Sequence, residues 1–320
     1  MKKVLILFGG NSQEHEISCK SVNFIIENID YDLFDVCLVG VDYDNKWYII
    51  KKDKININWK NNIIKSVDNI IGFASEFDIV FPMIHGNTVE DGKLQSMFEL
   101  FNIKYVGCNS YSSLISYDKL LTKLILEKFN IPQVPYVIYN SNTNLDEITY
   151  PVIVKPCKCG SSIGISVANN KSELKKGIKS ALKYDNNVII EEFIKHNREL
   201  ECAILEDKKK LIVSDVGEIV NNGKWYDYDS KYKNNTDTII SDIDKNIKSD
   251  IRTLSKTIFK ILNCKGLSRI DFIYDTIKNK LYFNELNTIP GFTSISMYPI
   301  LMNNIGINGK KLITKLLSID

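Results

Sequence analysis

The sequence of 320 residues has few histidines, no long apolar run and almost no net charge. Three histidines, His15, His85 and His196, are too few and too scattered for a histidine-rich metal site. No apolar stretch approaches the ~18 residues that a membrane-spanning helix needs. The net charge of +2, from 41 basic and 39 acidic residues, argues against a dedicated binder of nucleic acid or anionic membranes. We therefore expect neither nucleic acid nor a membrane as partner.

The seven cysteines lack the patterns of a disulfide framework or a zinc site. Their number is odd, and the one close pair, Cys157 and Cys159, does not have zinc-ligand spacing. The N-terminal apolar run extends only from Val4 to Phe8 with no small-residue cleavage site behind it, which makes a poor export signal. These features predict reduced thiols in a cytoplasmic protein. With no evident base nearby, Cys157 and Cys159 are expected to be spectators rather than nucleophiles.

What the chain does contain is an alternation of strand-like and helix-like segments, typical of α/β architecture. Length alone suggests about two domains at ~150 residues each, but the pattern divides the chain into three units. The first, residues 1–108, is predicted to be an open, doubly wound sheet with site loops at the carboxyl ends of its strands. Its expected strands are residues 3–8, 36–41 and 77–84, its clearest helix is 94–101, and a hairpin is expected around Asp44 and Asn45.

The second predicted unit is residues 109–193 and the third is residues 194–320. The second has expected helices at 120–126 and 172–184 and strands at 152–154, 165–168 and 188–190. The third has expected strands at 200–205 and 211–220, an aromatic loop at 225–232 and a helix at 247–262. Gly266 is the expected stop of that helix. No internal repeat or long low-complexity linker is present.

The most informative local pattern is a predicted hairpin formed by residues 268–274 and 281–287. If its turn centres on Lys278, Asp271 faces Glu285 and Arg269 faces Asn287. All four then share one face, while the apolar residues, which include Tyr282, mostly point to the other. Two carboxylates directly opposite each other destabilise a sheet, and a divalent cation between them removes that penalty. Two carboxylates and an amide suit Mg²⁺, although a solvated polar face in another register stays open.

Two glycine-rich segments follow predicted strands. Lys155 precedes the loop 160–164, whose backbone N–H groups suit phosphate oxygens. Because this lysine comes before the glycines, the segment is not the GxxxxGK[ST] P-loop, and an ordinary turn is an open alternative. Gly9 and Gly10 lack the GxGxxG fingerprint of dinucleotide sites. Glu14 behind them suits a substrate amine, or simply the positive end of a helix.

Two further features have both a functional and a structural interpretation. His85 follows a strand, where it is either a site residue or a hydrogen-bonded structural histidine. Tyr226, Tyr228, Lys231 and Tyr232 lie in the aromatic loop, which is either a lid that excludes water or a packed loop.

Taken together, these segments resemble the D-alanine–D-alanine ligases of the ATP-grasp superfamily, nearly over the whole chain and in the family's order. Residues 85–92 are similar to its HGxxGEDG segment, with Val89 in place of a glycine. Residues 225–232 are similar to its FYDYxxKY loop, with Trp225 in place of phenylalanine. The other matching segments are 8–18, 155–164 (KPxxxGSSxG) and 284–293 (NExNTxPGFT).

The resemblance implies a three-domain ATP-grasp architecture, α+β in its ATP-grasp part, and an ATP-dependent carboxylate–amine ligase. ATP would phosphorylate the carboxylate of one D-alanine, and the amine of a second would attack the acyl phosphate. The product would be D-alanyl-D-alanine, a peptidoglycan precursor. The resemblance also implies a homodimer, and two Mg²⁺ or Mn²⁺ ions beside ATP between the second and third units.

Residue roles follow from the same resemblance. Asp271, Glu285 and Asn287 would hold the metal ions, and Arg269 and the Gly291 amide would stabilise the oxyanion. Glu14 would bind the amine of the first D-alanine, His85 would lie near its carboxylate, and Ser161 and Tyr232 would link to Glu14 to close the lid. ATP would be bound by Lys119, Lys155, Ser162, Glu191, Phe193, Ile194, Glu199 and Lys231.

The choice of the second substrate depends on the end of the site where Ser296 would hold its carboxylate. Resistance ligases related to this family, which make D-alanyl-D-lactate or D-alanyl-D-serine, often carry arginine in an SRYP segment. Here Met297 occupies that position, and its apolar side chain suits the methyl group of D-alanine. Tyr232 in the aromatic loop also favours an enzyme that makes the dipeptide D-alanyl-D-alanine. Two other classes stay open: an ATP-grasp ligase with another acceptor, and a catalytically silent nucleotide-binding protein.

Overall fold

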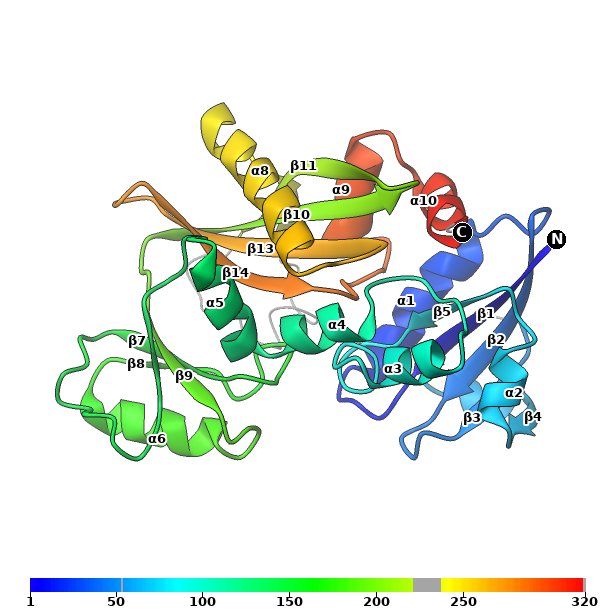
Figure 1. Ribbon diagram of the computed structural model, residues 1–320, viewed down its shortest axis with the longest axis horizontal. Coiled ribbons are helices and arrows are strands. Elements are labelled where there is room, and N and C mark those ends of the chain that lie inside the picture. The colour runs from blue at the N-terminus through cyan, green and yellow to red at the C-terminus, as the bar shows by residue number, and fades with distance from the viewer. Residues whose placement is uncertain (53, 221–236, 319–320) are drawn as a thin grey trace.

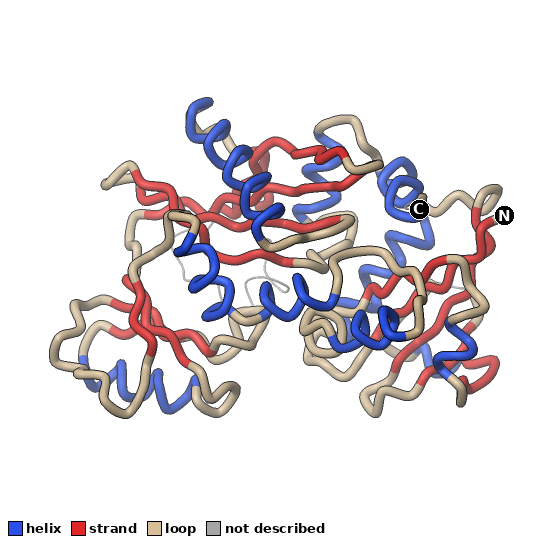
Figure 2. The backbone as a smooth tube through the Cα atoms, viewed as in Figure 1, coloured by secondary structure: helices blue, strands red, loops and turns tan. Residues whose placement is uncertain are grey.

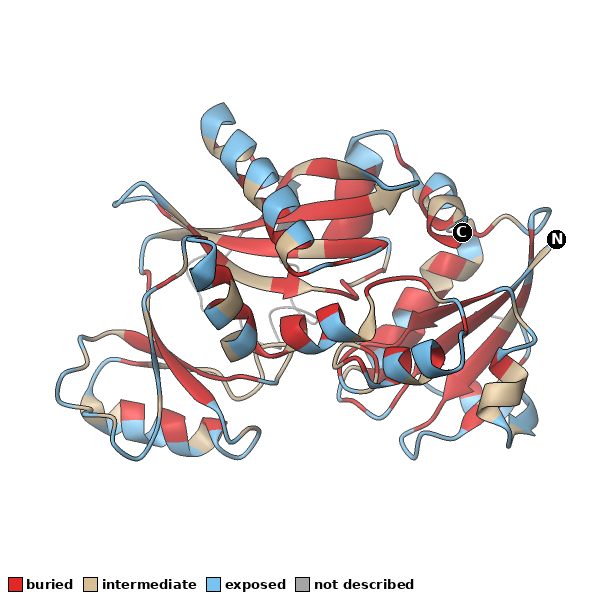
Figure 3. Cartoon of the chain, in the orientation of Figure 1, coloured by how far each residue is buried: buried red, intermediate tan, exposed pale blue. Residues whose placement is uncertain are grey.

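The computed structural model describes residues 1–52, 54–220 and 237–318 (Figure 1). Its strands form three sheets, two of five strands and one of four, which Figure 2 shows as three separate red groups. The strands are mostly buried, and the outward faces of the helices are exposed (Figure 3). The chain ends lie near each other, and Lys2 Nζ donates to Leu317 O at 2.8 Å. Within the described ranges, no helix combines the length and apolar character needed to cross a bilayer.

The first sheet has the strand order β4-β3-β2-β1-β5. Strand β1 pairs in parallel with β2 and β5, while β3 and β4 are antiparallel additions at one edge. The sheet comprises β1 (Lys2–Gly9), β2 (Phe34–Val41), β3 (Trp47–Ile50), β4 (Ile63–Val67) and β5 (Ile79–Met83). Because Val4 to Phe8 is fully buried, β1 needs an unbroken apolar run, and this is the run visible in the sequence. Helices α1 (His15–Asn28), α2 (Ile70–Ala74) and α3 (Lys93–Leu100) accompany this sheet.

The predicted open sheet is confirmed, and so is the hairpin at Asp44 and Asn45, where Asn45 has a φ of 59°. The 3-10 turn η1 (Trp59–Asn62) and β4 were not predicted from the sequence. Trp59, only 1% exposed, packs here with its ring edge against Phe8 and closes the core beneath this edge of the sheet.

The second sheet has the order β6-β9-β7-β8 and is entirely antiparallel. Its elements are β6 (Tyr136–Ile138), β7 (Val152–Pro156), β8 (Ser166–Ala168) and β9 (Val188–Glu192), with α6 (Lys171–Ala181) packed on one face. Helices α4 (Ser110–Tyr117) and α5 (Lys119–Lys128) precede it in the chain, but Ile115 and Leu126 belong to the core of the third sheet. The two helices therefore connect the three sheets across the middle of the molecule (Figure 1).

The third sheet has the order β12-β11-β10-β13-β14, with antiparallel neighbours throughout. Its strands are β10 (Asn197–Asp207), β11 (Lys210–Val220), β12 (Asp237–Ile240), β13 (Leu267–Asp275) and β14 (Lys280–Asn287). Helix α8 (Lys245–Ile261) buries its apolar face against this sheet. Helix α9 (Met297–Asn304) packs on β10 and β11, and α10 (Gly309–Leu317) packs on α1 and α9, in a core shared with the first sheet. Three sheets in three successive stretches support the predicted division of the chain, whose boundaries stay a prediction.

The predicted stop of α8 at Gly266 is wrong. The helix ends at the cap residue Leu262, and the next residue, Asn263, takes the left-handed conformation with a φ of 53°. Asparagine adopts this conformation more readily than most residues and can replace glycine just after a helix. Gly266, with a φ of 66°, instead allows two backbone segments to approach closely. A Cβ there would lie 3.0 Å from the backbone nitrogen of Gly107.

The predicted register of the β13–β14 hairpin is confirmed at its far end. Asp271 pairs with Glu285, and Arg269 pairs with Asn287. A β-bulge after Asp271 shifts the register toward the turn, so that Ile273 rather than Tyr274 faces Tyr282. The prediction that Tyr282 points to the apolar face with Phe272 is therefore wrong. Tyr282 instead packs with Ile273 and Ile194 on the opposite face.

Candidate active site

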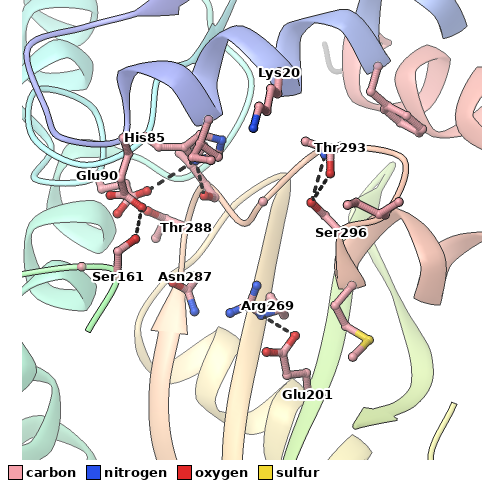
Figure 4. Close-up of a pocket in the computed structure, with 18 of the residues that line it drawn as sticks. Lys20, His85, Glu90, Ser161, Glu201, Arg269, Asn287, Thr288, Thr293 and Ser296 are labelled. Carbon is pink, nitrogen blue, oxygen red and sulfur yellow. Dashed lines mark hydrogen bonds and ion pairs between the residues drawn. The ribbon is translucent and has the colours of Figure 1, made fainter. Parts of the chain in front are cut away.

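A cavity of about 750 Å³ lies between α1, the turn at residues 159–161 and one face of the third sheet (Figure 4). The first sheet's loops, the second sheet's turn and the third sheet's strands all contribute to its wall. Ten of the predicted site residues line it: Glu14, His85, Lys119, Ser161, Arg269, Glu285, Asn287, Gly291, Ser296 and Met297. Residues almost 300 positions apart in the sequence therefore meet at one site.

Glu14 occupies the N-cap position of α1, directly after the turn that ends β1. Ser161 Oγ donates a hydrogen bond to Glu14 Oε1 and joins the first and second sheets across the cavity. Two glycines make room for this carboxylate. A Cβ on Gly86 would lie 3.1 Å from Glu14 Oε2, and one on Gly160 would lie 3.2 Å from the same atom. The predicted pairing of Glu14 with Ser161 is thus present in the structure.

The turn that carries Ser161 has an unusual backbone. Both Ser161 and Ser162 have positive φ values, 52° and 58°, and Ile163 N donates to Gly160 O at 3.1 Å. Two central residues with positive φ are the mark of a type I′ turn, which serine adopts less readily than glycine. Left-handed backbone at two successive non-glycine residues is often found at functional sites.

His85 is buried at the end of β5 and is 3% exposed. Its Nε2 lies 2.9 Å from Ser21 Oγ, and its Nδ1 lies 3.2 Å from Ile289 O and 3.7 Å from Glu90 Oε1. Burial acts to lower the pKa of His85, but Glu90 and Glu14 outweigh it, and the pKa rises above its ordinary value. The raised pKa favours the charged form of the ring next to Glu14, and that form suits the recognition of a carboxylate.

The predicted metal-binding residues lie on the site face of β13 and β14. Both carboxylate oxygens of Asp271 accept from Arg269, at 2.7 Å from Nε and 2.6 Å from Nη2. Asn287 Nδ2 donates to Asp271 Oδ2 at 3.0 Å. Glu285 Oε2 lies 4.0 Å from Lys119 Nζ. Burial acts to lower the pKa of Arg269, but Asp271 and Glu201 raise it well above its ordinary value, so the guanidinium stays charged.

Whether these residues suit a divalent cation can be judged from the donor set. Among the described residues, no group of three or more His, Cys, Asp or Glu side chains is arranged to hold a metal ion. The predicted set has only two carboxylates and one amide, and Mg²⁺ usually completes its shell with water and substrate phosphates. The pairing of Asp271 with Glu285 leaves like charges side by side, which a cation would relieve. The donor set therefore fits Mg²⁺ or Mn²⁺.

Behind this face, a buried carboxylate is held between two lysines. Glu191 Oε2 lies 2.5 Å from Lys155 Nζ, and Glu191 Oε1 lies 2.9 Å from Lys123 Nζ. Burial acts to raise the pKa of Glu191, but Lys155 and Lys123 outweigh it and lower that pKa to about 2. Lys155 Nζ also donates to Asn284 Oδ1 at 3.2 Å, which ties the second sheet to the third. Lys155 is thus fixed between the two sheets.

The other predicted ATP residues lie outside the cavity wall. Phe193 N donates to Pro151 O, and Ile194 is buried against Tyr282 of β14. Glu199 lies on β10 opposite Ile273. This places the set at the junction of the second and third sheets, where the nucleotide was expected, while its contacts to ATP stay a prediction. Lys231 and Tyr232 are outside the described residues.

The opposite end of the cavity is formed by the loop before α9. Ser296 Oγ accepts from Thr293 N at 3.1 Å and lies 2.7 Å from Thr293 Oγ1 (Figure 4). Gly291 adjoins it, since a Cβ there would lie 3.1 Å from Ser296 Oγ. Met297 is 3% exposed and packs on Gly217, where a Cβ would approach its sulfur to 2.3 Å. Met297 therefore supplies an apolar part of the wall beside Ser296, next to the polar Thr293 and Ser294.

The two cysteines nearest the turn, Cys157 and Cys159, have thiol pKa values raised by burial. Burial raises the pKa of Cys157 to about 12 and also raises that of Cys159. A thiol must lose its proton to react at neutral pH, so both observations support the prediction that these cysteines are spectators.

Several site residues were not singled out by the sequence. Glu201 pairs with Arg269, Lys123 pairs with Glu191, and Glu90 faces His85. The alternation of Glu199 and Glu201 along a strand was a usable signal, because it puts both carboxylates on one face. Lys123 gave none, since it lies on a helix whose partner strand is almost 70 residues away.

Comparison with known proteins decides the family. A family model described as D-ala D-ala ligase N-terminus matches residues 3–108, and one described as D-ala D-ala ligase C-terminus matches residues 125–318. The chain belongs to the D-alanine–D-alanine ligase family. The predictions of this family, of its ATP-grasp fold and of an ATP-dependent ligase are confirmed.

Relatives of this ligase match over nearly their full length. D-alanine–D-alanine ligase from Acetivibrio thermocellus is 40% identical, with 99% of this chain and 95% of the relative covered. D-alanine–D-alanine ligase B from Clostridium tetani is 39% identical, with 99% and 93% covered. Among solved structures, VanG D-Ala:D-Ser ligase from Enterococcus faecalis has a TM-score of 0.87 at 34% identity and 99% and 98% coverage. The D-alanine–D-alanine ligase from Coxiella burnetii has a TM-score of 0.84 at 28% identity and 99% and 92% coverage.

Proposed function

We propose that this protein uses ATP to join two D-alanines into D-alanyl-D-alanine for peptidoglycan synthesis. Its membership of the ligase family carries the reaction class. The observation that carries the site assignment is the convergence of Glu14, His85, Arg269 and Ser296 on one cavity of about 750 Å³. The cavity is large enough for two small amino acids and a phosphoryl group, and it offers both charge signs.

In the first step, the γ-phosphoryl group of ATP is transferred to the carboxylate of the first D-alanine. Glu14 holds the amine of this D-alanine, with Ser161 fixing the Glu14 carboxylate, and the positive charge of His85 orients the substrate carboxylate. Lys119 and Lys155 bind the ATP phosphates from the turn side. The γ-phosphorus–oxygen bond of ATP breaks, a new carboxylate–phosphorus bond forms, and ADP leaves.

In the second step, the amine of the second D-alanine attacks the acyl phosphate. Ser296 holds the carboxylate of this acceptor. The carbonyl oxygen gains negative charge in the tetrahedral intermediate, and the Arg269 guanidinium and the Gly291 N–H stabilise it. The intermediate then expels phosphate, the amine loses a proton, and the peptide bond remains. Because the Arg269 side chain is only 15% exposed, water screens its charge weakly.

Asp271, Glu285 and Asn287 are the residues that would hold Mg²⁺ or Mn²⁺, and Ser162, Glu191, Phe193, Ile194, Glu199 and Lys231 are the further residues proposed around ATP. A divalent ion supplies positive charge that neutralises the phosphate oxygens during transfer. Asp271 and Glu285 bring the required carboxylates together by strand pairing. Tyr232 is proposed to join the Glu14–Ser161 pair when substrate binds.

For the second substrate, the apolar part of the wall beside Ser296 favours D-alanine. Met297 is buried against Gly217 and offers no hydrogen-bond donor to a hydroxyl group. The similarity to VanG D-Ala:D-Ser ligase keeps D-serine as the alternative acceptor. An acceptor hydroxyl that faces Met297 is left unsatisfied, so we expect discrimination of at least about ten-fold in kcat/KM for D-alanine over D-serine.

The experiment that tests this proposal measures phosphate release and the dipeptide product. The purified protein is given ATP and Mg²⁺ with D-alanine alone, and then with D-alanine plus D-serine or D-lactate. We expect full activity with D-alanine alone and D-alanyl-D-alanine by mass spectrometry. If activity appears only in a mixture, the acceptor is D-serine or D-lactate rather than D-alanine. If no phosphate is released under any condition, the protein is a catalytically silent nucleotide-binding protein.

The resemblance also supports a homodimer in the cytoplasm as part of the proposal. Exposed apolar side chains available to a second copy are Leu100 and Phe101 at the end of α3, and Tyr111 and Leu114 on α4. Light scattering coupled to size-exclusion chromatography tests this directly. A monomer at micromolar concentration would contradict it.

A further inference from the structure

Arg269 lies between two carboxylates, of which only one is in the proposed metal-binding set. Asp271 accepts from both its Nε and its Nη2. On the other side, Glu201 Oε2 lies 2.9 Å from Nε as an ion pair, and Figure 4 shows this contact at the floor of the cavity. The Arg269 side chain is only 15% exposed, and that of Glu201 is 8% exposed. Arg269 is thus enclosed by carboxylates on two sides.

The Nε atom of Arg269 has one hydrogen and two carboxylate oxygens within hydrogen-bonding distance. They are Asp271 Oδ1 at 2.7 Å and Glu201 Oε2 at 2.9 Å. In this state the hydrogen points to Asp271. A small rotation of the guanidinium would transfer the hydrogen bond to Glu201 without moving either strand.

Strand pairing fixes Glu201 in this position. It lies on the central strand β10 directly opposite Asp271 on β13. On its other side it faces Gly217 of β11, which has no side chain to compete for the space. A backbone paired on both sides moves little, so Glu201 is a rigid partner for Arg269.

A divalent ion at Asp271 conflicts with the bond between Asp271 and Arg269. Asp271 Oδ2 accepts from both Arg269 Nη2 and Asn287 Nδ2, so both of its lone pairs are used, and an ion that binds this oxygen must displace an N–H group. A buried guanidinium without a partner would be strongly unfavourable. Glu201 can accept the Arg269 N–H group that Asp271 releases, because Glu201 already lies at ion-pair distance from Arg269.

We propose that Glu201 is a positioning residue that holds Arg269 when Asp271 turns to a divalent cation. When the metal ion binds, Arg269 changes its partner from Asp271 to Glu201. Its Nη2, released by Asp271, then faces the cavity and the oxyanion. The inference rests on the proposed function for the role of Arg269, but its metal-binding part can be measured without any reaction.

The third sheet offers a matched control. Arg198 and Glu218 form a second ion pair between β10 and β11, with Arg198 Nε at 2.8 Å from Glu218 Oε1. Glu218 is 8% exposed, close to the 6% of Glu201. Because Glu218 pairs with Leu200 rather than Glu201, it lies on the opposite face, away from the cavity. Glu218→Gln therefore removes a comparable charge from the same sheet without touching Arg269.

The first experiment compares Mn²⁺ binding in wild type, Glu201→Gln and Glu218→Gln, by electron paramagnetic resonance with a non-hydrolysable ATP analogue. In Glu201→Gln, the metal-free protein keeps the bond between Arg269 and Asp271. The metal-loaded protein, however, has no carboxylate at residue 201 to take over Arg269. We therefore expect Mn²⁺ affinity to fall about ten-fold or more, as for loss of a hydrogen bond between charged groups. Glu218→Gln should bind Mn²⁺ as wild type does. Equal Mn²⁺ affinity in Glu201→Gln and wild type would overturn the proposal.

A double-mutant cycle separates this exchange from a general attraction between Glu201 and the cation. If Glu201 acts through Arg269, Glu201→Gln should change Mn²⁺ affinity less than about two-fold in an Arg269→Met background. A ten-fold loss in both backgrounds would mean that Glu201 attracts the ion directly, and would contradict the positioning role. Thermal unfolding first establishes that each variant is folded. If Glu201→Gln does not fold, Glu201→Asp is used instead. Its shorter side chain places the carboxylate farther from Arg269, so we expect weaker Mn²⁺ binding. Unchanged Mn²⁺ binding in Glu201→Asp would count against the proposal.

Steady-state kinetics complete the test. Glu201→Gln should lower kcat while changing the KM for the first D-alanine less than about two-fold, because Glu14 and His85 are untouched. If wild type makes no dipeptide from D-alanine, the proposed function fails, but the Mn²⁺ comparison still decides the role of Glu201. If wild type makes the dipeptide and kcat is the same in Glu201→Gln, the positioning role fails alone.

Discussion

Replacing Glu191 by glutamine should destabilise the protein in a way that depends on pH. The carboxylate is buried between Lys123 and Lys155, at 2.9 and 2.5 Å. Burial alone raises its pKa, but the two lysines lower it from 4.5 to about 2. At ~1.4 kcal/mol per pKa unit, this difference corresponds to about 3 kcal/mol of stability at neutral pH. Removing the charge also leaves two buried lysines facing each other without a counter-ion.

The sign and the pH window follow from the direction of the shift. A carboxyl group whose pKa is lowered on folding stabilises the protein above its unfolded pKa of about 4.5. The contribution falls as pH decreases and is lost below about pH 2, where the carboxyl is protonated in both states. At about pH 3.5, roughly 2 of the 3 kcal/mol remain. The deficit of Glu191→Gln should therefore be constant from about pH 6 to 8 and should shrink in acid.

The assay is thermal unfolding across this pH range, supported by urea titration at neutral pH. A loss of about 3 kcal/mol should lower Tm by roughly 4–6 °C in a chain of this size. The neighbouring Glu192 is the control, because its ion pair with Lys278 at 2.6 Å is largely exposed. Glu192→Gln should cost less than about 1 kcal/mol. If Glu191→Gln melted within about 1 °C of wild type, or its deficit did not change with pH, the electrostatic account of this cluster would be refuted.

Four further changes test individual contacts. Ser161→Ala removes the hydrogen bond to Glu14 and should lower kcat/KM for D-alanine by about 10- to 100-fold with an unchanged Tm, and an equal KM would argue against the pairing. Gly86→Ala adds a Cβ at 2.8 Å from Ser12 at a φ of 76°, so we expect a loss of more than about 1 kcal/mol in denaturant titration. Asn263→Ala should cost about 0.5–1 kcal/mol, because alanine resists the left-handed φ of 53° that ends α8, whereas Asn263→Gly should not. Glu285→Gln should abolish most Mg²⁺-dependent phosphate release, and near-normal turnover would contradict the metal assignment.

The parts of the fold that could be predicted are those where burial imposes a period on the sequence. Strand β1 is buried on both faces and therefore shows an unbroken apolar run. Strand β4 at the edge of the same sheet is mostly exposed and shows no pattern, so it was missed. Helix α4 was missed for a different reason. Of its four buried residues only Ile115 is apolar, the others being Ser112, Ser113 and Ser116, and serine does not mark a helix face.

The residues of the candidate site also fall into a group that could be predicted from the sequence and a group that could not. Residues in local motifs, such as Glu14 and Ser161, could be named from the sequence, because each follows a strand or lies in a glycine-rich turn. Their partners could not, since Lys123 and Glu201 acquire meaning only from residues on other elements. For Glu201 the deciding fact is a strand pairing, β10 against β13, over almost 70 residues of chain.

The β-bulge in β14 explains why the hairpin could be predicted at the site and yet be wrong near the turn. From the turn, Asp275 pairs with Lys280 and Phe272 with Phe283, whose rings meet edge to face at 6.5 Å in the core. Continued without a bulge, this register would place Glu285 opposite Ile270 on the apolar face. The extra residue, Asn284, restores Asp271 to Glu285 and contributes its own Oδ1 to Lys155 at 3.2 Å. The bulge therefore lets one hairpin supply an apolar core at one end and paired carboxylates at the other.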